Sequence, residues 1–274
     1  MNKINLKLIL ALILLIFISL PIFISSLLDF KQKKTQEENY QKLLKEEQTQ
    51  KEAEEKIYLM GKFDPNKRED FVLIPVKHIT NGSKMYLRKE VLDAFLKMQE
   101  AANKDEVDLK IASATRNFIY QKNIWNNKWT GIMLVDGKNL EKSIPDELKR
   151  FKKILEYSAV PGTSRHHFGT DIDINDANPE YFETEKGEKV YEWLIKNVSL
   201  FGFCQPYNPK GGNRLTGYKE EKWHWSYLPL AKTFTQQYKD LIKDEDINGF
   251  LGDENVIGED LINNYVLGIN PDCL

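Results

Sequence analysis

The chain has 274 residues, of which 41% are hydrophobic and 29% are charged, so it can bury a sizeable core in one or two domains. Its formal net charge of −2 at pH 7 gives none of the basic excess that nucleic-acid binding usually requires, and we expect no nucleic-acid partner. Two cysteines, Cys204 and Cys273, are too few for a disulfide framework or a four-cysteine zinc site.

Residues 1–30 have the composition of a membrane segment. Lys3 and Lys7 precede an uncharged apolar run, residues 8–28, which is long enough to cross a bilayer. A cleaved signal peptide is the alternative, with Ser25-Ser26 near the cut, although the apolar region of such a peptide usually has only about 7–15 residues. We therefore favour a retained single-pass anchor, with the rest of the chain outside the cytoplasm because lysines prefer the cytoplasmic side.

Residues 31–60 are rich in Lys, Glu and Gln and contain neither glycine nor proline. Because interleaved lysines and glutamates can pair four residues apart on a helix, we predict a charged helical linker. The segment lacks a sustained apolar heptad, which favours a solvated spacer over a coiled-coil dimer. We therefore expect a monomer.

Residues 61–243 alternate between short strand-like and helix-like segments. An apolar run at 71–76 and an alternating pattern at 107–112 predict strands, whereas 87–103 and 145–157 predict helices. This loose alternation favours an α+β domain over a doubly wound sheet. We expect a small mixed or antiparallel sheet with flanking helices.

The stretch 164–173 has the composition of a metal site. Two histidines, His166 and His167, precede a strand-like alternation in which Asp171 and Asp173 share one face. If the turn carries His166 over that face, an imidazole nitrogen and a carboxylate oxygen converge on one point, which suits Zn²⁺. On an extended backbone His167 would point elsewhere, so we expect it to have a structural role.

A second stretch supplies a third ligand and a base. His224 completes a two-histidine, one-carboxylate set with His166 and Asp173, and it leaves a fourth position for water, as in catalytic zinc sites. Glu221, three residues before His224, would then act as general base on that water. The expected cofactor is one Zn²⁺ per chain, in a cleft, and the expected chemistry is hydrolysis.

Both stretches together resemble the paired signature of the VanY-type D-alanyl-D-alanine carboxypeptidases, in the LAS group of metallopeptidases. The matching residues are Ser164-x-His166-x-x-Gly169-x-Asp171-x-Asp173 and Glu221-x-x-His224, with Asp171 where the usual pattern has alanine. The resemblance implies an α+β zinc peptidase with the same three ligands and the same base. It also implies that Arg116 faces the substrate carboxylate and the developing oxyanion, and that Ser164 and Gln121 contact the substrate.

The resemblance implies that the chain acts on peptidoglycan stem peptides. We expect a D,D-carboxypeptidase that removes the C-terminal D-alanine, held in the bacterial cell membrane by the N-terminal helix with its domain on the periplasmic or wall side. The same site would suit an L,D-carboxypeptidase acting on tetrapeptide stems, or a D,D-dipeptidase or endopeptidase. The non-enzymatic alternative is a zinc-stabilised wall-binding module, which would have no need of Glu221.

Residues 244–274 form an acidic C-terminal tail, which we expect to pack on the domain. Outside the cytoplasm oxidation is permitted, so we predict a disulfide between Cys204 and Cys273 that fixes this tail.

Overall fold

The computed structural model describes residues 6–274, except for the side chains of residues 6–9, 11, 12 and 22. The chain divides into two compact units, one ending at Ala53 and the other spanning Glu54–Leu274. Lys3 and the side chain of Lys7, on which the predicted membrane orientation depends, lie outside the described part.

Helix α1 (Leu6–Leu59) contains the apolar run and continues through the charged segment. The stretch Ile13–Leu59 holds a window of mean hydropathy 2.4, long and apolar enough to cross a membrane. The large apolar side chains described between Leu10 and Leu28 are exposed, as for Phe17 at 74%. In the charged part, Lys34 pairs with Glu38 and Lys42 with Glu46, each at 3.8 Å and four residues apart.

The folded unit contains two antiparallel sheets, which confirms the prediction of a domain mixing helices with small antiparallel sheets. One sheet has four strands in the order β3-β4-β6-β5, and the other pairs β1 with β2. The strands are β1 (Phe71–Leu73), β2 (Tyr86–Arg88), β3 (Ile111–Ser113), β4 (Asp171–Ile174), β5 (Phe203–Cys204) and β6 (His224–Tyr227).

The pairing of β4 with β6 separates apolar from polar side chains. Ile172 lies opposite Trp225, and both are buried in a core formed with helices α2 (Lys89–Lys104) and α6 (Glu185–Asn197). Because side chains alternate along a strand, the residues on either side of this pair face the opposite way. Those residues pair as Asp171 with Ser226 and Asp173 with His224, so the polar face of the sheet carries the candidate site.

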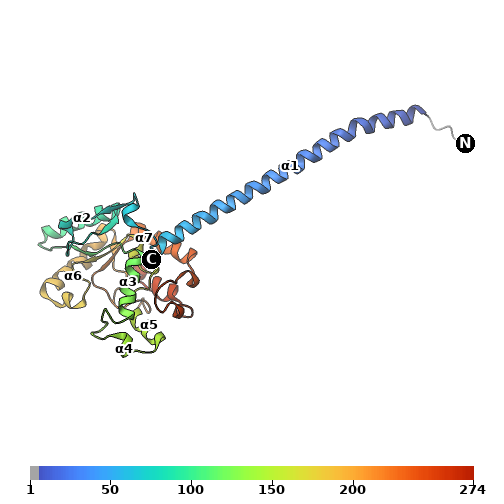
Figure 1. Ribbon diagram of the computed structural model, residues 1–274. Coiled ribbons are helices and arrows are strands. Elements are labelled where there is room, and N and C mark those ends of the chain that lie inside the picture. The colour runs from blue at the N-terminus through green and yellow to red at the C-terminus, as the bar shows by residue number, and fades with distance from the viewer. Residues whose placement is uncertain (1–5) are drawn as a thin grey trace. The chain divides into compact units, whose positions relative to one another are not determined.

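A second core includes helices α3 (Phe118–Trp129), α5 (Glu147–Leu155) and α7 (Leu228–Leu241), together with the C-terminal tail. The short helix α4 (Leu140–Ser143) packs beside α3. Figure 1 shows α3, α4 and α5 grouped together, with α2 and α6 to their left. The first core thus covers the apolar side chains of the sheet, and the second contains Phe168, three residues before β4.

The elements differ in their bounds from the sequence-based expectation. The strand expected at 71–76 ends at Leu73, and the helix expected at 145–157 spans Glu147–Leu155. The strand expected at 107–112 begins only at Ile111, because side chains take part of the backbone hydrogen bonding before it. Gln99 Nε2 donates to the carbonyl of Leu109 at 2.5 Å, and the amide of Lys110 donates to Asn175 Oδ1 at 2.7 Å. The helix expected from residue 87 begins two residues later, since the preceding residues pair with β1.

The C-terminal tail is cross-linked to the sheet. Cys204 at the end of β5 and Cys273 near the C-terminus form a disulfide, with Cα atoms 5.9 Å apart, as predicted. Tail residues such as Phe250 are buried in the second core. The Phe250 ring lies 5.6 Å from the Trp125 ring in a T-shaped arrangement. The Trp125 indole N–H also donates to the carbonyl of Leu251 at 2.9 Å.

Removing the cross-link should destabilise the folded unit. Replacing Cys204 and Cys273 by serine is expected to lower the free energy of unfolding by about 2–5 kcal/mol, because the disulfide restricts the unfolded chain. Urea titration followed by tryptophan fluorescence measures this. Wild-type chain in a reductant is the matched control, and its urea midpoint should equal that of the double variant. Equal midpoints for oxidised and reduced wild type would contradict the prediction.

Candidate metal centre

The turn before β4 brings His166 over the sheet. Residues Arg165–Phe168 form a 3₁₀ turn, and Gly169 ends it with φ 72°, a left-handed conformation that glycine adopts without strain. A Cβ atom at this position would lie 2.4 Å from the ring of Phe71. The motif therefore requires glycine where the chain turns into β4.

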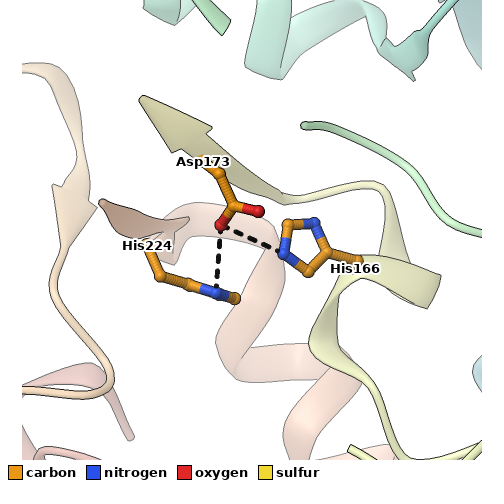
Figure 2. Close-up of side chains that lie close together, drawn as sticks. All are labelled: His166, Asp173 and His224. Carbon is orange, nitrogen blue, oxygen red and sulfur yellow. Dashed lines mark ion pairs between the residues drawn. The ribbon is translucent and has the colours of Figure 1, made fainter. Parts of the chain in front are cut away.

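Three side chains converge on the polar face of β4. Figure 2 shows His166, Asp173 and His224 pointing toward one another from the turn, β4 and β6. Asp173 Oδ1 lies 3.3 Å from His166 Nε2 and 3.4 Å from His224 Nδ1. One ligand atom from each residue lies within 4.8 Å of the other two, and all three residues are buried. The fold thus brings together the three residues expected to bind zinc.

The donor atoms of this cluster fit a zinc ion. Asp173 Oδ1 is buried and has no hydrogen-bond partner within the described chain. His166 Nδ1 lies 2.8 Å from the carbonyl oxygen of Ala114, so that nitrogen donates and Nε2 keeps its lone pair toward the cluster. His224 Nε2 lies 2.8 Å from Asp171 Oδ2, which leaves Nδ1 facing the cluster. Two imidazole nitrogens and one carboxylate oxygen are a donor set of catalytic zinc sites.

The charge on His224 follows from its carboxylate neighbours. Burial alone would lower its pKa, but hydrogen bonds to the carboxylates of Asp171 and Glu221 outweigh burial and raise the pKa to about 9. A metal ion would take the place of the proton on Nδ1, since ligand imidazoles bind metal in the neutral form.

The cluster opens into a cavity of about 340 Å³. Its lining includes His166 and His224 together with the other residues expected at the site, namely Arg116, Gln121, Ser164 and Glu221. Asp173 lies behind the two histidines, with its side chain fully buried. One cavity therefore gathers residues from α3, the turn, β6 and the segments before α3 and β6.

Arg116 lies beside the carboxylate of Asp173. Its Nη2 donates to Asp173 Oδ2 at 2.5 Å and its Nε donates to Ser113 Oγ at 2.9 Å. Its backbone N–H donates to the carbonyl of His166 at 3.2 Å. Burial alone would raise the pKa of Asp173, but the His166 imidazole and the Arg116 guanidinium outweigh burial and hold that pKa below its usual value. The carboxylate is therefore ionised and held in place for a metal.

Glu221 stands at the edge of the cluster. Its Oε2 lies 3.1 Å from His224 Nδ1, and its side chain is 15% exposed. Its backbone N–H donates to the carbonyl of Tyr207 at 2.9 Å, and its carbonyl accepts from Gln205 Nε2 at 3.0 Å. These bonds fix the segment before β6 so that the carboxylate faces both the cavity and the ligands.

A family model described as VanY, D-alanyl-D-alanine carboxypeptidase, matches residues 84–230, which is more than half of the chain. The matched region contains the three-residue cluster, Glu221 and Arg116. The chain belongs to the VanY family. The resemblance seen in the two motifs is therefore confirmed.

Two relatives illustrate the relationship of this VanY-family chain. It is 30% identical over 195 residues to YodJ of Bacillus subtilis, named as a candidate carboxypeptidase, covering 68% of this chain and 62% of the relative. It is 26% identical over 176 residues to a D-alanyl-D-alanine carboxypeptidase of Enterococcus faecalis, covering 64% of this chain and 60% of the relative. The chain spans about three fifths of the length of these two relatives.

Solved structures of related enzymes also match. The LdcB LD-carboxypeptidase is 28% identical, with a TM-score of 0.47, covering 68% of this chain and 79% of that one. A mutant of the D,D-pentapeptidase VanY in complex with Zn(II) is 25% identical, with a TM-score of 0.44, covering 64% of this chain and 94% of that one.

Asp171 has a buried partner that the sequence analysis missed. Arg165 Nε donates to Asp171 Oδ2 at 3.0 Å, and both side chains are fully buried. The other arginine nitrogens donate to Thr235 Oγ1 at 2.8 Å and Ser226 Oγ at 2.7 Å. Asp171 Oδ1 accepts from Ser226 and Thr170. The available signal was an arginine and an extra acid within one motif.

The ion pair also positions His224, one of the three expected metal ligands. Burial alone would raise the pKa of Asp171, but the Arg165 guanidinium and the hydrogen bond from His224 outweigh burial and keep the pKa below its usual value. The ionised carboxylate then accepts the Nε2 proton of His224 and fixes the orientation of that ring. In this VanY-family chain Asp171 therefore supports the site from behind.

His167 has a structural role, as expected. Its Nε2 accepts the backbone N–H of Gly162 at 3.1 Å, so Nδ1 carries the proton and donates to the carbonyl of Arg116 at 2.6 Å. Burial lowers the pKa of this imidazole to about 3, so the ring is neutral at physiological pH. His167 therefore connects the backbone of Gly162 to the backbone of Arg116.

The zinc content of the Asp173→Asn variant tests whether His166, Asp173 and His224 bind the metal. The purified full chain is expected to hold about one zinc ion, and Asp173→Asn is expected to lose it because an amide oxygen carries no charge. Elemental analysis by mass spectrometry measures the zinc-to-protein ratio. Asp176→Asn, which changes an exposed carboxylate three residues further on, is the matched control and should keep its zinc. A zinc-loaded Asp173→Asn would contradict the assignment.

Proposed function

We propose that this chain is a zinc-dependent D,D-carboxypeptidase that removes the C-terminal D-alanine from peptidoglycan stem peptides. The observation that carries the proposal is the Glu221 carboxylate 3.1 Å from His224 Nδ1, beside a three-donor cluster that opens into a cavity. A zinc ion serving only the fold would call for a fourth protein ligand and no base. This arrangement favours a hydrolase over a wall-binding module.

Each residue at the cluster has an assigned role. A bound zinc ion would polarise the scissile carbonyl and ease the ionisation of water. Glu221 takes a proton from the attacking water and returns it to the leaving amine, so one water and one peptide bond give D-alanine and a shortened peptide. Arg116, already held by Asp173 and Ser113, directs its remaining N–H groups at the developing oxyanion.

Gln121 and Ser164 are assigned to the substrate backbone. Gln121 Nε2 donates to the carbonyl of Ala159 at 2.8 Å, whereas its Oε1 is buried and lacks a partner among the described residues. A buried acceptor without a partner costs free energy, which a substrate N–H would recover. Ser164 lines the same cavity two residues before the ligand His166.

The same cluster supports neighbouring specificities. An L,D-carboxypeptidase acting on tetrapeptide stems, a D,D-dipeptidase or an endopeptidase would use the same ligands and base. The Enterococcus faecalis relative, named as a D-alanyl-D-alanine carboxypeptidase, supports the D,D assignment.

We assign the parts of the chain accordingly. Residues 1–30 anchor it in the bacterial cell membrane, residues 31–60 are the linker, residues 61–243 are the catalytic domain and residues 244–274 are its tail. The exposed apolar side chains of α1 support the anchor, and the disulfide supports a domain on the oxidising side of the membrane. We propose that the chain is a monomer.

Mass spectrometry of defined muropeptides tests the function. The full chain in detergent, loaded with zinc, is incubated separately with tetrapeptide and pentapeptide stems. Loss of one alanine from the pentapeptide alone is the expected result. Loss from the tetrapeptide alone would assign the L,D activity instead, and two unchanged substrates with zinc bound would contradict the peptidase assignment.

A further inference from the structure

Lys128 is a cation of the cavity whose ammonium donates to a hydroxyl rather than to a carboxylate. It lies on α3 seven residues after Gln121, which is two helical turns, and both side chains line the cavity. Its ammonium donates to the hydroxyl of Ser158, which also lines the cavity. In the part of the chain that the structure describes, it forms no ion pair with an aspartate or glutamate.

The surroundings of Lys128 favour an incoming anion. Burial lowers the pKa of its ammonium to about 8, with Arg116 acting in the same direction and Glu221 opposing it. Lys128 is half-buried, and an ammonium partly withdrawn from water without a carboxylate in hydrogen-bond contact costs free energy. A carboxylate that enters the cavity would recover this cost and form a charge-assisted hydrogen bond.

Arg116 is poorly placed to serve two substrate anions. Its charge is already balanced by the carboxylate of Asp173, 2.5 Å from Nη2, and Ser113 holds its Nε. A carboxypeptidase substrate presents two separate anionic positions, the oxyanion that develops at the scissile carbonyl and the carboxylate at the end of the next residue. A second cation is needed if both are to be neutralised.

We propose that Lys128 and Ser158 bind the terminal α-carboxylate of the peptide substrate, which leaves Arg116 for the oxyanion. The inference rests on the proposed carboxypeptidase function and names the residues that would restrict it to free C-termini. Lys128 and Glu221 line the same cavity and their charges interact, so the ammonium lies near its catalytic end. The last residue of the substrate must occupy that end.

Paired peptides test this assignment in the full, zinc-loaded chain. The same pentapeptide stem is offered with a free C-terminus and as the C-terminal carboxamide, and kcat/KM is measured for both. Wild type is expected to prefer the free acid by about 10- to 100-fold, the range of a charged hydrogen bond. In Lys128→Met this preference should fall to within a few-fold, through a higher KM for the acid.

Two further variants make the result specific. Lys128→Arg keeps a cation and should retain most of the preference, whereas Lys122→Met removes a lysine from the same helix outside the cavity and should match wild type. An unchanged preference in a folded Lys128→Met, or no preference in wild type, would overturn the assignment while leaving the peptidase in place. No hydrolysis of either peptide by wild type would instead refute the proposed function.

Discussion

Glu221→Gln is expected to lower kcat on the pentapeptide stem by about 10²- to 10⁴-fold while the chain keeps its zinc. The amide is nearly isosteric with the carboxylate, but it cannot accept the proton of the attacking water. The side chain at position 221 would stay beside His224 Nδ1, 3.1 Å away in the wild type, because the backbone of this residue is hydrogen-bonded to Tyr207 and Gln205. Steady-state kinetics and zinc content measure the two effects together.

Glu220→Gln is the matched control for this prediction. It removes the same charge one residue away, from a side chain whose carboxylate accepts from the Tyr191 hydroxyl at 3.3 Å. We expect it to retain wild-type kcat. Full activity in Glu221→Gln would place the base elsewhere, and loss of zinc from that variant would make the residue a ligand.

The second large effect concerns Asp171, the acid that lies behind His224. Asp171→Ala is expected to lower the free energy of unfolding by about 3–5 kcal/mol, because it leaves the Arg165 guanidinium buried without a counter-charge. It should also weaken zinc binding by about 10- to 100-fold, since His224 Nε2 loses its acceptor. Urea titration measures the first effect, and competition with a zinc chelator measures the second.

The double variant Arg165→Leu, Asp171→Ala separates these two roles. Removing both charges should restore most of the lost stability, because no unpaired ion remains in the core. Zinc affinity should stay low, because the support behind His224 is still missing. If the double variant were as unstable as Asp171→Ala, the buried ion pair would not explain the loss, and unchanged zinc affinity would remove Asp171 from the metal site.

The candidate site was predictable from sequence where its geometry is local. The alternation of Asp171, Ile172 and Asp173 indicates which side chains share a face, and Gly169 indicates the reversal before them. The distinction between the two aspartates is not local. It depends on the β4–β6 register, which sets Asp173 opposite His224, and on Arg165, which neutralises Asp171 from behind.

The parts of the fold that escaped prediction depend on contacts between distant segments. The strand expected at 107–112 is shorter because the side chains of Gln99 and Asn175 take part of the backbone hydrogen bonding before Ile111. The partner of Lys128 could not be predicted from the sequence either, because acidic residues are plentiful there. The packing of α3 against the segment containing Ser158 places a hydroxyl, rather than a carboxylate, at the ammonium.

The disulfide lies close to the segment that holds the proposed base. Cys204 directly precedes Gln205, whose side chain donates to the Glu221 carbonyl, and Asn270 of the cross-linked tail donates to the carbonyl of Pro206 at 2.8 Å. Formation of the disulfide should therefore help to position Glu221 through Gln205. With the domain outside the cytoplasm, as we propose, this brace would form only once the chain has left the reducing cytoplasm.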